Sequence, residues 1–184
     1  MLIEADRSIL LIVDLQERLI PAIHAGDAVT ERARILIRAA DALEIPVEVT
    51  EQYPRGLGPT VAPIRDILPE TAMIHEKITF SAQRKPAFAA HFALLRDSGR
   101  DQIVVAGAEA HVCVLQTALD QQAQGYQIFL VADAVGSRAP ESRDLAIERA
   151  RQAGCIVANT EMVVFEWMER AGNDTFRALS RLIR

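Results

Sequence analysis

The fold is decided by one stretch, Gln102-Ile-Val-Val-Ala-Gly-Ala-Glu-Ala-His-Val-Cys113-Val-Leu-Gln-Thr-Ala-Leu-Asp-Gln-Gln-Ala-Gln-Gly125. It opens with the apolar run Gln102–Ala106, which has the length and composition of a buried strand. After a short glycine-containing link, a helical pattern covers Val112–Gln124 and stops at Gly125, a residue typical of helix ends. A strand that leads directly into a helix is the building unit of parallel sheets.

The same unit repeats along the chain. Five further strands are predicted, at Ile9–Val13, Val47–Thr50, Met73–Lys77, Gln127–Val131 and Ile156–Ala158. Helices are predicted between them, at Thr30–Leu43, Phe88–Leu95 and Ser142–Ala153. Because the strands are apolar on both faces and alternate with helices, the sequence predicts a doubly wound, three-layer α/β domain. No linker divides the chain, so we expect a single domain over residues 1–184.

Composition excludes several classes of protein. Of the 184 residues, 50% are hydrophobic and 24% charged, which suits a soluble domain with an aliphatic core. The net charge of −5 comes without a basic cluster, which argues against a nucleic-acid partner. The apolar runs are far shorter than the roughly 20 residues of a membrane span, and the acidic N-terminus does not resemble a secretion signal. We therefore expect a cytoplasmic protein with no membrane partner.

Three predicted strands end in reactive side chains. Asp14 follows Ile9–Val13, Lys77 closes Met73–Lys77, and Cys113 follows the strand at Gln102–Ala106. Parallel strands bring their carboxyl ends to one edge of the sheet, so an acid, a base and a thiol are expected to converge there. A nearby ammonium and the start of a helix are expected to lower the pKa of Cys113 and to activate it as a nucleophile. The alternative is that Cys113 is a small buried apolar residue.

The long segment Glu51–Pro69 interrupts the alternation of strands and helices. It contains four prolines and two glycines and follows the second predicted strand at the edge where α/β proteins bind ligands. Either it is an ordered loop that helps to form a ligand crevice, or it is only a connector.

The motifs resemble those of the isochorismatase-like cysteine hydrolases. Asp14 lies in Val13-Asp-Leu-Gln16, Lys77 precedes Thr79-Phe-Ser-Ala82, and Cys113 lies in Gly107-Ala-Glu-Ala-His-Val-Cys-Val-Leu-Gln-Thr-Ala-Leu-Asp120. The segment Thr50-Glu-Gln-Tyr-Pro-Arg-Gly-Leu-Gly-Pro-Thr60 resembles the branch named isochorismatase-domain-containing proteins. The likeness extends from Ile9 to about Val164.

This resemblance implies a six-stranded parallel sheet and a catalytic triad. Cys113 would be the nucleophile, Asp14 the general acid and base, and Lys77 the supporting cation. A cis peptide bond would join Ala108 to Glu109 and direct the Glu109 N–H, with that of Cys113, toward a developing oxyanion.

Two departures from relatives narrow the chemistry. Nicotinamidase relatives carry an Asp-x-His-x-His-type metal site after the second strand, whereas this chain has no histidine between His24 and His75. No metal is therefore expected in that loop, and no nucleotide motif or other feature calls for a cofactor. True isochorismatases lack the nucleophilic cysteine. The resemblance thus points to a metal-independent hydrolase acting on a small amide-like or ester-like molecule, a probable C–N amidohydrolase with no assigned substrate.

Other residues have two interpretations each. Gln52, Tyr53, Phe80 and His111 are candidate walls of the substrate pocket, or are ordinary packing residues. His75 shares a strand face with Lys77 and is expected to be a packed, hydrogen-bonded histidine.

Three further features are expected to be structural. Asp133 is expected to bond loop backbone or to pair with Arg138, and Cys155 to be buried and inert. The amphipathic run Glu161–Arg184 is expected to pack on the sheet or on a sister subunit.

A second function from another class fits the same residues. An accessible thiol is also what a redox sensor requires, so a small-molecule-binding or thiol redox-sensing protein on this scaffold is the alternative. A homo-oligomer is expected from the resemblance.

Overall fold

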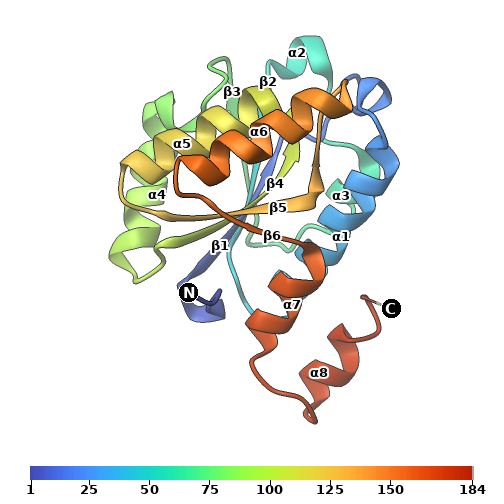
Figure 1. The fold of residues 1–184 in the computed structure, drawn as a ribbon, viewed down its shortest axis with the longest axis vertical. Helices are drawn as coiled ribbons and strands as arrows, with labels where there is room; N and C mark the ends of the chain where they lie inside the picture. Colours follow the sequence, from blue (N-terminus) through green and yellow to red (C-terminus); the bar gives the residue numbers. More distant parts are fainter. Residues whose placement is uncertain (184) are drawn as a thin grey trace.

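The computed structural model describes residues 1–183, which form a parallel sheet covered by helices on both faces (Figure 1). The strand order is β3-β2-β1-β4-β5-β6, and every neighbouring pair is parallel. The strands are β1 (Ser8–Val13), β2 (Val47–Gln52), β3 (Met73–Lys77), β4 (Gln102–Ala108), β5 (Gln127–Gly136) and β6 (Ile156–Ala158). All six predicted strands are present, and the predicted six-stranded parallel sheet is confirmed.

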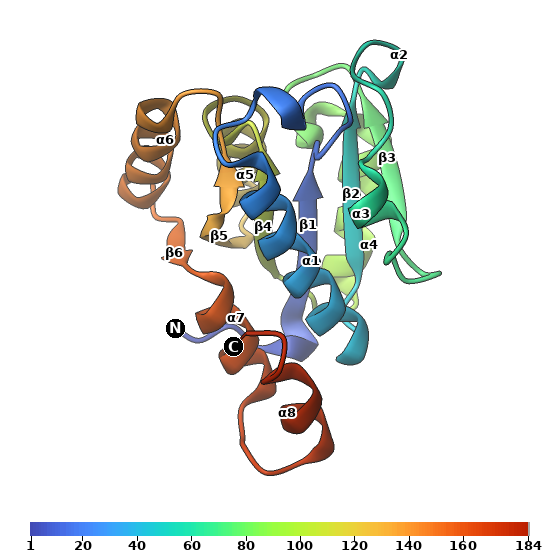
Figure 2. The same cartoon turned by 90° about the vertical axis from the view of Figure 1, so that its right-hand side faces the viewer.

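The helices form the two outer layers. They are α1 (Gly26–Ala42), α2 (Pro54–Leu57), α3 (Ala62–Arg65), α4 (Pro86–Asp97), α5 (Leu115–Ala123), α6 (Pro140–Gln152), α7 (Thr160–Met168) and α8 (Asp174–Leu179). Helices α1, α3, α7 and α8 contribute to the core on one face of the sheet, and α4, α5 and α6 to the core on the other. Figure 2 shows these two layers on either side of the strands.

Strand β1 lies at the centre of both cores. Leu10 and Ile12 point into one core, and Ile9, Leu11 and Val13 into the other. Every residue of β1 is buried, as expected for a parallel strand covered on both faces. The end of this strand is therefore held in place from all sides.

Strand order reverses beside β1, because β2 lies on one side of it and β4 on the other. Open α/β sheets bind ligands at such a switch point, beyond the carboxyl ends of the strands. Here the backbones of β1 and β4 approach closely: Gly107 has φ +125°, and a Cβ at this position would lie 2.1 Å from the carbonyl oxygen of Val13. Only glycine fits at this point in the sheet.

Two helix boundaries differ from the sequence prediction. Helix α1 begins at Gly26, four residues before the predicted start at Thr30. A Cβ on Gly26 would lie 2.6 Å from the carbonyl oxygen of Ile20. The helix predicted over Val112–Gln124 is divided into a π-helical turn, η4 (Ala110–Val114), and α5. Single π turns inside helices are frequent at functional sites.

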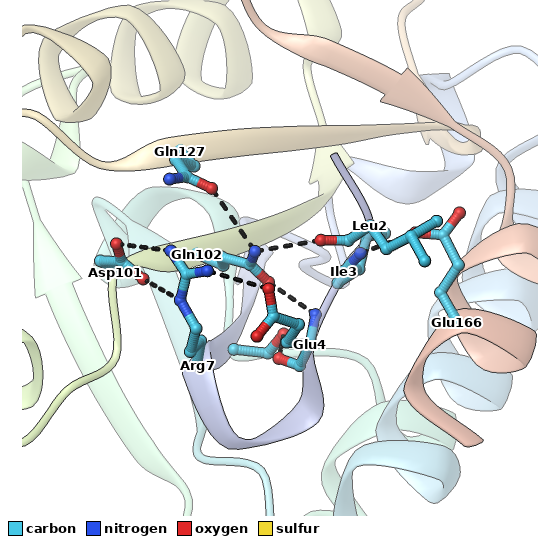
Figure 3. Close-up of polar contacts among 9 residues, drawn as sticks. Leu2, Ile3, Glu4, Arg7, Asp101, Gln102, Gln127 and Glu166 are labelled. Atoms are coloured by element: carbon cyan, nitrogen blue, oxygen red, sulfur yellow. Dashed lines mark hydrogen bonds and ion pairs between the residues drawn. The ribbon is translucent and has the colours of Figure 1, made fainter. Parts of the chain in front are cut away.

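The amino end of the sheet is tied to the N-terminal segment (Figure 3). The buried Gln102 side chain accepts a hydrogen bond from Glu4 N at 2.7 Å, and Ile3 N donates to Glu166 Oε2 of α7 at 2.7 Å. Arg7 pairs with Asp101 at 2.8 Å. These contacts leave the opposite, carboxyl edge of the strands free to carry the site.

In the C-terminal run, α7 packs on the sheet and α8 packs on α7. Trp167 of α7 is buried, and its Nε1 donates to Ser8 Oγ at 2.9 Å. Leu179 of α8 joins the same core. Within residues 1–183, no helix combines the length and the apolar character needed to cross a bilayer.

Candidate active site

Asp14 follows β1 directly and is completely buried. Its backbone has φ +50°, which is uncommon for a residue other than glycine, and its N–H donates to the carbonyl of Thr50 at 3.1 Å. The hydroxyl of Thr50, near the end of β2, donates to Asp14 Oδ1 at 2.6 Å. The carboxylate is thus aimed by its own backbone turn and by the neighbouring strand.

Lys77 brings a positive charge to the second oxygen of this carboxylate. Its Nζ lies 2.7 Å from Asp14 Oδ2 and 2.8 Å from Gln52 Oε1. The Lys77 side chain is 1% exposed and that of Asp14 0%. The predicted convergence of the acid and the base at one sheet edge is therefore present in the structure.

Gln52 and Gln16 brace this pair. Gln52 holds Lys77 through Oε1 and donates from Nε2 to the carbonyl of Ile78 at 2.7 Å. Gln16, completely buried, accepts from Gln52 N at 2.7 Å and donates to the carbonyl of Gly58 at 2.7 Å. The sequence indicates a pocket wall at Gln52, and the residue proves to be a partner of Lys77. Gln16 and Thr50 were not singled out, although each is a polar residue at the end of an apolar strand.

Cys113 lies in η4, near enough to Asp14 and Lys77 for both charges to influence the pKa of its thiol. The side chain is buried, at 5% exposure, and burial raises the pKa of the Cys113 thiol to about 12. Desolvation contributes most to this rise in pKa, the negative charge of Asp14 contributes in the same direction, and the ammonium of Lys77 opposes both. The prediction of a lowered pKa is therefore wrong: desolvation and the neighbouring carboxylate outweigh the lysine and the helix start, so the resting sulfur is a protonated thiol.

The segment between β4 and Cys113 carries Glu109. The peptide bond between Ala108 and Glu109 is cis, as the resemblance implied. The Glu109 carboxylate pairs with Arg138 Nε at 2.9 Å and accepts from Arg138 N at 3.3 Å. This side chain is therefore engaged with the loop before α6, and the backbone N–H of Glu109 is the part of the residue left as a candidate for contact with substrate.

The other predicted pocket residues differ in their relation to the Asp14–Lys77–Cys113 cluster: Tyr53 N donates to the carbonyl of Lys77 at 2.8 Å, whereas the His111 side chain bonds elsewhere. His111 Nδ1 lies 2.9 Å from Ser137 Oγ, and its side chain lines a small cleft against α6. Tyr53 and Phe80 are 52% and 54% exposed. The Tyr53 ring lies against Gly56 in α2, where a Cβ would come within 2.4 Å of Tyr53 Cδ1.

Other sequence expectations have mixed outcomes. Asp133 does bond backbone, since its Oδ1 accepts from Thr160 N at 2.8 Å. Of the two alternatives expected for Asp133, the backbone bond is therefore the one present: Arg138 pairs with Glu109 instead, and Asp133 Oδ2 lies 3.5 Å from Arg32 Nε. Cys155 is buried as predicted, and burial raises its pKa to about 11.

A cleft of about 370 Å³ opens beside Lys77. Its walls combine apolar side chains with the exposed Arg84, the half-buried Lys85 and the exposed carboxylate of Glu76. The lining residues are Pro54, Glu76, Lys77, Ile78, Thr79, Arg84, Lys85 and Pro86. This volume suits a small ligand. Lys77 lines this cleft, whereas Asp14 and Cys113 are buried and are not among the residues of its wall.

The cluster and the sheet together define a hydrolase-type site at the carboxyl edge of a parallel α/β sheet, and the chain belongs to the isochorismatase family. The model of the Isochorismatase domain matches residues 8–162. The match therefore includes Asp14, Lys77 and Cys113.

Known proteins agree with this assignment. Isochorismatase domain-containing protein 2 of Danio rerio is 34% identical over 176 residues, which are 96% of this chain and 86% of the relative. A solved structure named MAR1 ribonuclease, from Caenorhabditis elegans, is 34% identical, with a TM-score of 0.92 over 100% of this chain and 92% of its own. The YcaC gene product of Escherichia coli, described as an octameric hydrolase of unknown specificity, has the same fold, with a TM-score of 0.90 at 24% identity and coverage of 100% and 89%.

Proposed function

We propose that the protein is a metal-independent cysteine hydrolase that cleaves a small amide-like or ester-like substrate. The observation that carries the proposal is the buried 2.7 Å ion pair of Asp14 and Lys77, together with a buried Cys113 near enough for both charges to influence the pKa of its thiol. An acid, a base and a sulfur nucleophile gathered in one buried site are the parts that acyl transfer through a thioester requires.

The protonated resting state of Cys113 assigns the first proton transfer. As the sulfur attacks the substrate carbonyl carbon, a C–S bond forms and the thiol proton passes to Asp14. Lys77 then loses part of its attraction to the neutralised Asp14 and stabilises the sulfur anion as it develops. The carbonyl oxygen becomes an oxyanion, for which the N–H groups of Glu109 and Cys113 are the proposed donors.

The second half of the cycle returns the proton. Collapse of the tetrahedral intermediate breaks the C–N or C–O bond, and Asp14 protonates the leaving group. The Asp14 carboxylate then takes a proton from water as the water attacks the thioester. Cleavage of the C–S bond releases the acid, and Asp14 returns the proton to Cys113.

The cleft beside Lys77 suggests where substrate enters. Arg84 and Lys85 give it positive charge, while Ile78 and Pro54 give it an apolar wall. We therefore infer a small substrate with an apolar part and an anionic or strongly polar end. Tyr53 and Phe80 remain candidates for contacts with this substrate.

The test is an assay of ammonia and acid release on a panel of small amides and esters. Covalent labelling with p-nitrophenyl acetate, followed by peptide mapping, locates the acyl group. We expect it on Cys113 and expect Cys113→Ser and Asp14→Asn to abolish turnover, with Cys155→Ser as the matched active control. Full turnover by Cys113→Ser, or an acyl group on another residue, contradicts the proposal.

A homo-oligomer is also proposed. The Escherichia coli neighbour is described as octameric, and here the large apolar side chains of Tyr53, Ile78 and Phe80 are more than half exposed beside the edge strand β3. Such a patch on an edge strand is typical of a surface that another chain covers. Native mass spectrometry is expected to give a multiple of the chain mass. In Ile78→Asp, the measured mass is expected to shift toward that of the monomer.

The alternative of a redox sensor has less support. Oxidation by peroxide proceeds through the thiolate, and both Cys113 and Cys155 have a raised pKa. Peptide mapping after peroxide treatment tests it, because a stable Cys113–Cys155 disulfide would favour the sensor.

An RNA substrate also has less support. The Caenorhabditis elegans protein is named a ribonuclease, but the present chain has a net charge of −5 and no basic surplus to attract phosphates. A labelled RNA in the assay panel tests this directly.

A further inference from the structure

A second polar cluster, away from Cys113, joins one acid and two histidines. Glu48 Oε2 lies 2.6 Å from His75 Nε2, and Glu48 Oε1 lies 2.8 Å from His91 Nε2. The three ligand atoms lie within 4.8 Å of one another. The Glu48 side chain is 3% exposed and that of His75 8%. One buried carboxylate thus holds two imidazoles through both of its oxygens.

The cluster is built by three different elements. Glu48 lies on β2, His75 on β3 and His91 on α4, which packs over this end of the sheet (Figure 2). Residues on one strand alternate between faces, and the register pairs Thr50 with His75, so Glu48 and His75 share a face. The His75 ring meets Phe88 edge-on, with centroids 5.1 Å apart. The donor atoms are therefore held by the fold and not by a mobile loop.

Two imidazoles and a carboxylate are a common ligand set for Zn²⁺. Donors bound to one tetrahedral Zn²⁺ at about 2.0–2.1 Å are about 3.3 Å apart. The hydrogen-bonded distances of 2.6 and 2.8 Å, which go to different oxygens of Glu48, would widen by about 0.5–0.7 Å to reach this value. The two Nε2 atoms, which lie within 4.8 Å of each other, would take the same spacing. Each histidine would move its proton from Nε2 to Nδ1, so that Nε2 is free to bind the metal.

A cleft beside the cluster supplies an independent indication. It has a volume of about 570 Å³, and Glu48 and His91 form part of its wall. Among the described residues that line it, Asp41, Glu44 and Glu70 add negative charge, and none is Lys or Arg. A Zn²⁺ with the single carboxylate of Glu48 retains a net positive charge, which this acidic wall would offset. The cleft also leaves room for a fourth ligand.

We propose that Glu48, His75 and His91 form a Zn²⁺ site whose fourth position opens to the acidic cleft. This site differs from the loop site of nicotinamidases, because its ligands come from β2, β3 and α4. It holds together the two strands that carry Gln52 and Lys77 at their other ends. Its role is to fix these strands, and it takes no part in the proposed hydrolysis.

The test measures metal binding and stability, and does not depend on activity. Protein stripped with a chelator is titrated with Zn²⁺ by calorimetry, and Co²⁺ replaces Zn²⁺ to report coordination by visible absorption. We expect one equivalent bound, a tetrahedral Co²⁺ spectrum without a thiolate band, and a higher melting temperature with Zn²⁺. In His91→Gln and Glu48→Gln, the affinity is expected to fall by more than the about 10–100-fold that loss of an outer-shell partner costs.

Matched variants separate this site from others. Cys113→Ser and His111→Gln alter a thiol and a histidine outside the cluster and are expected to bind Zn²⁺ as the wild type does. His91 is the least buried ligand, so His91→Gln is the variant most suited to remain folded, which circular dichroism checks. Absence of Zn²⁺ binding in the wild type overturns the proposal and leaves a hydrogen-bonded His–Glu–His cluster. Binding that is lost in Cys113→Ser and retained in His91→Gln also overturns it.

Discussion

The ammonium of Lys77 and the carboxylate of Asp14 form an ion pair of 2.7 Å that is almost completely closed to solvent. Removing two charges from water costs several kcal/mol for each ion, so such a pair adds little net stability. Its presence in the interior is therefore better explained by the chemistry of the site than by a contribution to folding.

Removal of one member of this ion pair should lower the free energy of unfolding. In Lys77→Met, Asp14 is left as an uncompensated buried charge, and we expect the free energy of unfolding to fall by about 3–5 kcal/mol. Turnover should be abolished as well. Urea denaturation measures the first effect. Lys85→Met is the matched control, because Lys85 bonds only the Glu76 carbonyl at the surface, and a similar loss in both variants would contradict the argument.

The raised pKa of Cys113 makes alkylation by iodoacetamide slow. With a pKa of about 12, roughly one thiol in ten thousand is ionised at pH 8, so the rate should climb steadily from pH 6 to 9 without a plateau. Asp14→Asn removes the negative charge that raises this pKa, and should speed alkylation while stopping turnover. Peptide mapping follows Cys113 and uses Cys155 as an internal control. A rate that levels off near pH 7 in the wild type would show a preformed thiolate.

The raised pKa values of the two cysteines also make the free energy of unfolding depend on pH. A group whose pKa is raised by folding contributes stability that is full below its unfolded pKa and is lost as the pH rises toward the folded value. The pH range of this loss begins at the ordinary thiol pKa of 9.0 for both residues, and it ends at about 12 for Cys113 and about 11 for Cys155. We expect the free energy of unfolding of the wild type to decline above pH 9, and that of Cys155→Ala to decline less steeply. Equal slopes for the two proteins would be inconsistent with burial of an un-ionised Cys155.

Thr50 is expected to act by positioning Asp14. Thr50→Val removes the hydroxyl that donates to Asp14 Oδ1 but keeps the side-chain shape, so it leaves one carboxylate oxygen without its donor. We expect kcat to fall about tenfold or more, which corresponds to about 1.5–3 kcal/mol for a bond to a charged group, with KM unchanged. Thr50→Ser retains the hydroxyl and should retain most of the activity. Equal losses in both would mean that the methyl group matters, not the hydrogen bond.

Gly107 should tolerate no side chain. In Gly107→Ala the new Cβ meets the Val13 backbone at 2.1 Å, at the switch point of the sheet, and we expect destabilisation of about 3 kcal/mol or more. Gly99→Ala is the control, because Gly99 also has a positive φ but a Cβ there would have no atom within 4 Å, and the change should cost only about 1 kcal/mol. Thermal unfolding distinguishes the two.

Most of the sheet could be predicted from the sequence because strands buried on both faces appear as continuous apolar runs. Strands β1, β4 and β5 follow from such runs, whereas the edge strand β3 is partly polar and partly exposed. The polar residues at the ends of β1 and β3 indicate the edge that carries the candidate site. The division of the predicted helix near Cys113 was missed, because η4 and α5 have the same apolar spacing. The early start of α1 was missed because it depends on a contact between Gly26 and Ile20 that local sequence does not reveal.

The site could be predicted less completely than the sheet. Position along the chain indicates which residues meet, but the pKa of Cys113 depends on how much solvent the packing excludes, which spacing does not show. Gln52 was predicted to be a pocket wall and not a partner of Lys77, because Lys77, its neighbour on the adjacent strand β3, is 25 residues away in sequence. Glu48 and His91 were overlooked because their partnership with His75 exists only once β2, β3 and α4 are assembled.

The buried ion pair has one further consequence, which concerns electroneutrality. In the proposed cycle, the resting triad holds a carboxylate, an ammonium and a neutral thiol, and the attacking triad holds a neutral acid, an ammonium and a sulfur anion. The sum is zero in both, so the interior never gains a net charge while a proton moves within it. Buried charges are screened little by salt, whereas the exposed Arg84 is screened strongly and the half-buried Lys85 in part. Ionic strength should therefore leave the chemical step unchanged and act only on the capture of substrate at the mouth of the cleft.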